Sequence, residues 1–194
     1  MVQHRDQVRR VLELLSYMTQ SYDPDGLDLC FSTESGKHKP KDNEQMLRYF
    51  DERPAHGLPD MRERFASIIE QYQARFGKRN ILSKLLHFDS TPTIGPRRLT
   101  LYVLTDGVWQ PGCTLVTEIR RLVSLLQEHR LPNKHIGIQF IRFGNNAEGK
   151  RRLQKLDSGL GLELYVRPCF RSYTLPIVEL TDLVIFPQHS YMLT

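Results

Sequence analysis

The stretch that decides the fold is Arg98-Leu99-Thr100-Leu101-Tyr102-Val103-Leu104-Thr105-Asp106-Gly107. Five apolar residues between Leu99 and Leu104 form a nearly continuous run, which is typical of a strand buried on both faces of a sheet. The run ends in Thr-Asp-Gly, and a helical pattern follows from Leu115. Open α/β sheets bind their ligands at the carboxyl ends of such strands, so Asp106 is the leading candidate for a functional group. The alternative is a purely structural role, because Asp-Gly is also ordinary turn chemistry.

Helical and strand patterns alternate on both sides of this strand. Before it, the apolar spacing and the turn residues predict a strand over 27–32 and helices over 3–20, 43–50 and 61–76. Asp60 with Glu63 resembles a capping box at the start of the last of these helices, and Gly77 is expected to end it. After the strand, the same signals predict helices over 115–126 and 147–157 and strands over 136–143 and 162–166. Residues 78–97 are expected to be helix or packed loop followed by a connection.

This alternation predicts an α/β fold: a Rossmann-like, mostly parallel sheet with helices on both faces. Residues 1–166 account for the whole pattern as one domain. Residues 167–194 form an irregular tail, in which 177–186 is apolar enough for an edge strand.

Composition restricts the class of protein. The chain has 194 residues with 40% hydrophobic and 25% charged residues, which is typical of a globular domain with a sizeable core. There is no apolar run of about 18 residues, and residues 1–10 are polar, so we expect neither a membrane span nor a secretory signal. Cys30, Cys113 and Cys169 form no C-x-x-C pair. We therefore expect reduced thiols in an intracellular, cytoplasmic protein.

The order of the elements resembles the von Willebrand factor A domain in its intracellular fungal form. Three stretches carry the likeness: Tyr22-Asp23-Pro24-Asp25-Gly26-Leu27-Asp28-Leu29, the segment Leu101–Gly107, and Ile136-Gly137-Ile138-Gln139-Phe140-Ile141-Arg142-Phe143-Gly144-Asn145 before a helix. The resemblance implies a metal-ion-dependent adhesion site at the carboxyl edge of the sheet. In the family, D-x-S-x-S, a Thr from a later loop and an Asp before Gly hold magnesium, and a partner's carboxylate completes the shell.

Most of that metal site is missing here. No D-x-S-x-S occurs, Leu58 stands where the family has its Thr, and only Asp106 matches a ligand position. One carboxylate holds magnesium poorly against its hydration shell. We therefore expect no cofactor, with magnesium at Asp106, helped by an oxygen from Asp60, as the alternative.

The chain begins at what would be the family's first helix, so the central first strand is expected to be missing. Two consequences are open. The C-terminal segment 177–186 fills the gap, or the chain is a fragment whose exposed edges promote self-association. We favour the fragment.

The sequence thus predicts a non-enzymatic protein-interaction domain with a degenerate metal site. Its partner, an unidentified protein, is expected at Asp106, Gly107, Trp109 and Gln110, with Trp109 either anchoring the partner or packing in the core. One alternative is an α/β enzyme or metal-dependent binding protein that uses Asp106, although no catalytic partner group is evident in the sequence. Another is a weak nucleic-acid binder, since the net charge is +5, but no recognition motif supports it.

Overall fold

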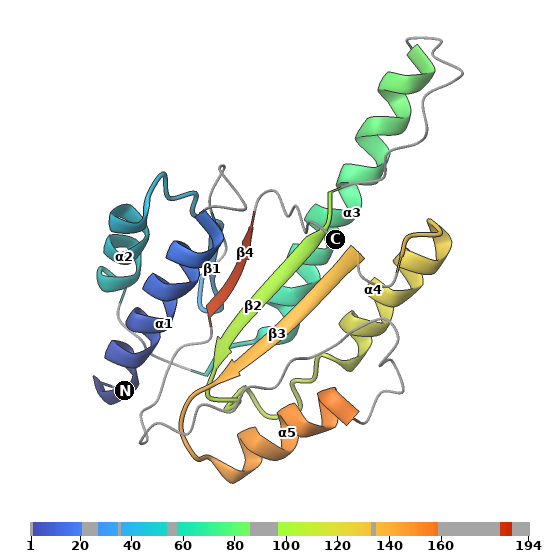
Figure 1. The fold of residues 1–194 in the computed structure, drawn as a ribbon. Coiled ribbons are helices and arrows are strands. Elements are labelled where there is room, and N and C mark those ends of the chain that lie inside the picture. Colours follow the sequence, from blue (N-terminus) through green and yellow to red (C-terminus); the bar gives the residue numbers. More distant parts are fainter. Residues whose placement is uncertain are drawn as a thin grey trace.

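The computed structural model describes residues 2–20, 27–34, 36–53, 58–85, 97–132, 135–158 and 183–187. The described residues form both helices and strands, interspersed along the chain, which confirms a mixed α/β fold (Figure 1). Their order is α1 (Val2–Gln20), β1 (Leu27–Phe31), α2 (Asn43–Asp51), α3 (Met61–Leu85), β2 (Leu99–Thr105), α4 (Val116–Glu128), β3 (Ile136–Arg142), α5 (Ala147–Ser158) and β4 (Leu183–Pro187). The strand predicted over 162–166 lies outside the described residues.

The described strands form one sheet in the order β1-β4-β2-β3. β2 and β3 are parallel neighbours along their whole length, from Leu99 opposite Ile136 to Thr105 opposite Arg142. β4 runs antiparallel to both β1 and β2. Consequently β1, β2 and β3 share one direction, as expected. However, the pairing is less parallel than predicted, because in the described sheet only β2 and β3 form a parallel ladder.

The central position of the sheet, which was expected to be empty, is occupied by β4. The strand was expected at an edge, but it lies between β1 and β2 (Figure 1). It pairs with β1 over five positions and with β2 over three. The ladder bonds that β1 and β2 would lack without a central strand are therefore made by the C-terminal segment, which was the less favoured of the two alternatives. Whether the chain is a fragment remains a separate prediction.

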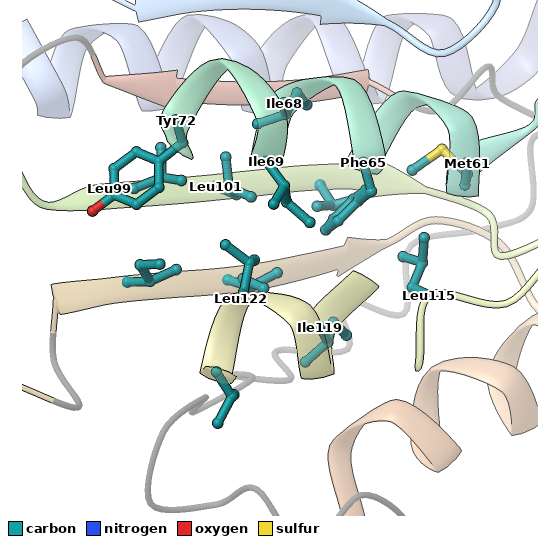
Figure 2. Packing of buried hydrophobic residues seen from close by; sticks show 14 of the residues in the cluster. Met61, Phe65, Ile68, Ile69, Tyr72, Leu99, Leu101, Leu115, Ile119 and Leu122 are labelled. Carbon is teal, nitrogen blue, oxygen red and sulfur yellow. The ribbon is translucent and has the colours of Figure 1, made fainter. Parts of the chain in front are cut away.

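Two apolar clusters cover opposite faces of the sheet, as predicted. Alternate side chains of a strand point to opposite faces. On β2, Leu101 and Val103 join the cluster formed with α3, α4 and α5, whereas Leu104 joins the cluster formed with α1 and α2. Figure 2 shows the first cluster, with Phe65 and Ile69 of α3 facing the strands. The carboxyl end of β2 is therefore held between two packed layers.

α3 is longer than predicted. Asp60 caps its start, where one carboxylate oxygen accepts the amide N–H groups of Arg62 (3.0 Å) and Glu63 (3.1 Å). The helix then continues through Gly77 to Leu85, and its end extends beyond the sheet (Figure 1). Gly77 fails to end α3 because a glycine inside a helix costs only about 1 kcal/mol relative to alanine.

No described helix has the length and apolar character needed to cross a membrane.

Candidate functional site

The turn after β2 is organised by Thr105, the last residue of the strand. Its buried hydroxyl oxygen accepts the backbone N–H of Gly107 (2.8 Å) and the indole N–H of Trp109 (3.0 Å). Its carbonyl accepts the N–H of Phe143 (2.9 Å), just after β3. One side chain therefore fixes both the path of the turn and the orientation of the indole.

Asp106 lies at the expected carboxyl end of β2, but it is largely covered. Only 7% of the residue is exposed. Its Oδ1 accepts the N–H of Val108 (2.8 Å), a local bond typical of Asp in turns. The structure thus gives Asp106 the turn role that the sequence left as an alternative.

The first turn of α5 lies directly against the Asp106–Gly107 turn. Gly107 has φ +77°, and a Cβ there would come within 2.6 Å of Gly149 Cα. A Cβ on Gly149 would in turn meet the carbonyl oxygen of Asp106 at 2.3 Å. Asn146 caps α5 by accepting the Gly149 N–H (2.9 Å). The two backbones can approach this closely only because both positions are glycine.

Arg152 of α5 holds the same turn from the other side. Its guanidinium donates to the Gly107 carbonyl (2.6 Å) and to Glu148 (2.9 Å). It also lies 5.2 Å from the ring centroid of Trp109, within the range of a cation–π contact. No sequence signal pointed to Arg152, since it stands 45 residues from Gly107 along the chain.

Trp109 is not a rim residue. It is 3% exposed and belongs to the cluster under α3 and α4. The core-packing alternative therefore describes it, and its indole is not accessible to a partner in this arrangement.

Gln110 is exposed, and it joins the turn to the loop before α3. Its backbone N–H donates to the Pro59 carbonyl (3.2 Å), and its side-chain amide donates to the Leu58 carbonyl (3.2 Å). Leu58 itself is 52% exposed, unlike most of the large apolar residues in the part of the chain that the structure describes. The sequence aligns Leu58 with the family's Thr position but carries no signal that this side chain is exposed.

Residues 110–113 form a tight turn beside Leu58. The N–H of Cys113 donates to the Gln110 carbonyl (3.0 Å), and Gly112 has φ +77°. Pro followed by Gly with positive φ is typical of a type II turn. Pro111 and Gly112 are exposed. We call the surface formed by Leu58, Gln110, Pro111 and Gly112 the 58/110 edge.

The residues at this edge do not fit magnesium. Asp106 offers a covered carboxylate that already accepts one bond. The Oδ1 of Asp60 accepts two helix amides and lies 3.8 Å from the Cys113 sulfur. Across the described ranges, no group of three or more His, Cys, Asp or Glu residues could hold a metal ion. A hard cation needs several oxygen ligands, and Leu58 supplies none where the family has a hydroxyl.

The described cysteines are free thiols and are not activated. Burial raises the pKa of the Cys30 thiol, against the opposing effect of the Arg64 guanidinium. Burial also raises the pKa of the Cys113 thiol, and the Asp60 carboxylate adds to that shift. A raised pKa keeps the sulfur protonated and weakly nucleophilic at neutral pH.

Comparisons with protein-family models, with curated proteins and with solved structures found no match to this chain. The von Willebrand A resemblance therefore rests on the residues of the chain alone.

Proposed function

We propose that this chain is a non-enzymatic protein-binding domain of the von Willebrand A type, and that it binds its partner at the 58/110 edge without a metal ion. One observation carries the proposal: a half-exposed Leu58 is held beside Gln110 at the carboxyl side of the sheet by two hydrogen bonds. Binding residues are often found on loops that a rigid scaffold positions in this way.

The chemistry of the edge favours a polypeptide partner. Leu58 offers an apolar contact. The Gln110 side chain uses its N–H group on the Leu58 carbonyl, and its Oε1 has no hydrogen bond within the described residues, so it can accept an N–H from a partner. The Pro111–Gly112 turn adds exposed backbone with little side-chain entropy to lose. A segment with one apolar side chain next to a backbone N–H would fit these groups.

The four residues first expected to bind a partner have different roles in this proposal. Gln110 contacts the partner. Asp106, Gly107 and Trp109 position the edge, since they belong to the turn that Thr105 and Arg152 hold. Replacement of a family Thr by Leu58 turns a metal-ligand position into an apolar contact, which is why the proposal includes no ion.

The test is capture of proteins from extracts of the cells that express the chain, with quantification for three baits. The wild type and Arg48→Ala, a change at an exposed α2 residue, are expected to retain the same partner. Leu58→Asp is expected to bind that partner at least about tenfold more weakly, or by roughly 1.4 kcal/mol, because the substitution places a charge in an apolar contact. The proposal fails if no protein is retained by the first two baits and lost by the third.

A further inference from the structure

α1 has an outward face that the described chain leaves uncovered. Val8 and Leu12 are fully buried in the cluster with α2 and β1. On the opposite side, Leu14 is 56% exposed and Tyr17 is 76% exposed. Asp6, Arg10 and Glu13 are exposed along the same side. The steps of four, three, one and three residues place all of these side chains on one strip of the helix.

The strip alternates in charge. Asp6 is negative, Arg10 positive and Glu13 negative, and none of them forms an ion pair with another described residue. The neighbouring arginines behave differently: Arg9 pairs with Asp51 at 3.1 Å, and Arg5 donates to the carbonyls of Phe50, Asp51 and Arg53. The inner flank of α1 is thus paired within the chain, whereas the charges of the strip are left for solvent or for a partner.

We propose that α1 pairs antiparallel with α1 of a second copy of this chain, about a two-fold axis level with Val11 and Leu12. In that register Arg10 lies opposite Glu13 of the second copy, and the two-fold axis makes this pair twice. The Tyr17 hydroxyl lies opposite the Asp6 carboxylate of the second copy and donates to it. Leu14 packs on the aliphatic stem of Arg10 of the second copy.

Self-complementarity is the reason for choosing a second copy. A two-fold interface uses the same patch on both chains, so a charged strip fits its own reversed copy only if no like charges face each other and at least some opposite charges do. This strip meets that condition for Arg10 with Glu13. A parallel pairing would place Arg10 against Arg10 and Glu13 against Glu13, which like-charge repulsion disfavours. The surface is also distinct from the strand edges from which the sequence predicted self-association.

The test is sedimentation velocity of the full chain over roughly 1 to 100 µM, a range suited to a weak interface of small area. The wild type is expected to reach twice the mass of one chain. Arg10→Glu and Glu13→Arg are each expected to stay monomeric. Mixing the two variants is expected to restore a dimer, because glutamates at 10 and 13 then face arginines at 13 and 10.

The controls separate this surface from others. Lys155→Glu reverses an exposed charge on α5 and is expected to leave the dimer intact. Leu58→Asp is expected to do the same, so that failure of one proposal does not affect the other. Circular dichroism is expected to show unchanged helix content for both α1 variants, since the substituted side chains are exposed. A monomeric wild type over the whole range, single reversals that still dimerise, or a mixture that does not pair would each overturn the proposal.

Discussion

Two glycines meet where the turn after β2 touches α5, and this contact supports the candidate edge. Gly107 and Gly112 have the same backbone angle, φ +77°, but different surroundings. A Cβ on Gly107 would lie 2.6 Å from Gly149 Cα, whereas a Cβ on Gly112 would meet nothing within 4 Å. Comparing an alanine at Gly107 with an alanine at Gly112 therefore separates the free-energy cost of a close contact from the cost of positive φ.

We expect Gly107→Ala to lower the free energy of unfolding by about 1–3 kcal/mol more than Gly112→Ala, because only the first forces two backbones apart. Both variants share the penalty of about 1–2 kcal/mol for a left-handed residue with a side chain. Urea unfolding of the two variants measures the difference. Equal losses would mean that α5 does not press on the turn.

His4 makes stability depend on pH. The residue is buried, and burial lowers the pKa of its imidazole from 6.5 to about 4. As pH falls below 6.5, the unfolded chain takes up a proton before the folded chain does. Stability is therefore fully present above pH 6.5 and is lost as pH falls toward 4.

Urea unfolding between pH 7 and pH 5 is expected to show this loss, of about 1–2 kcal/mol. Between pH 7 and pH 5 the titration of Glu34 does not contribute. Its pKa is lowered from 4.5 by its hydrogen bonds to Arg53 and His38, against the opposing effect of burial. The stability that Glu34 contributes is lost only at lower pH. His4→Gln is expected to flatten the dependence over the same window. An equally steep dependence in that variant would remove His4 as the cause.

Among the elements, β4 decides how the sheet holds together. Leu183-Val184-Ile185-Phe186 is an apolar run without alternation, the pattern expected of a strand covered on both faces. Its neighbours lie far away in the chain: Phe31 pairs with Leu183, and Tyr102 pairs with Ile185. Pro187 lies at the end of the ladder, opposite Leu27, where a missing N–H does least harm.

Amide hydrogen exchange tests this placement. The amides of Val184 and Ile185 are expected to exchange about as slowly as those of Val103 and Leu104 in β2, because a central strand opens only with the rest of the sheet. The exposed backbone of Gly112 provides a fast-exchanging reference. Exchange of Val184 and Ile185 at that fast rate would contradict a central β4.

At the scale of the whole molecule, the question is whether a divalent ion contributes to stability. The metal site of the von Willebrand A family, which this chain resembles, draws its ligands from three separate segments. Of those ligands only Asp106, at the end of β2, has a counterpart here. We expect millimolar Mg²⁺ or Mn²⁺ to leave the midpoint of thermal unfolding unchanged. An ion at about 100 times its dissociation constant would add roughly 2.7 kcal/mol, which is a shift of several degrees. A clear shift that Asp106→Asn abolishes would restore the metal-dependent alternative.

Local patterns were enough to locate most elements. The apolar spacing of the first helix marked α1. The capping residue Asp60 marked the start of α3, as its hydrogen bonds to the first turn confirm. The prediction went wrong where a local signal was weak. Gly77 does not end α3, because a permissive residue ends a helix only when the chain beyond it turns away.

The candidate site was only half predictable. The sequence placed Asp106 and Gly107 at the end of β2 and Gln110 in the following loop, since strand ends and turn residues are local features. For Trp109 the sequence left two interpretations open, a partner anchor or a core residue, and the structure shows it buried in the core. The Thr105 hydroxyl and the Arg152 guanidinium draw the indole into the core, and the second of these contacts comes from a distant helix.

The amino-acid order alone therefore determines the α/β class, the approximate positions of most helices and strands, and the turn that carries Asp106, because period and turn chemistry depend on neighbouring residues. The tertiary structure decides that β4 enters the sheet between β1 and β2, and that Leu58 lies beside Gln110. The second depends on Gln110, whose side-chain amide and backbone N–H donate to the carbonyls of Leu58 and Pro59. The first depends on backbone hydrogen bonds between remote strands. Such bonds use the same N–H and C=O groups at every residue, so the identity of a strand's partner is not written in the strand itself.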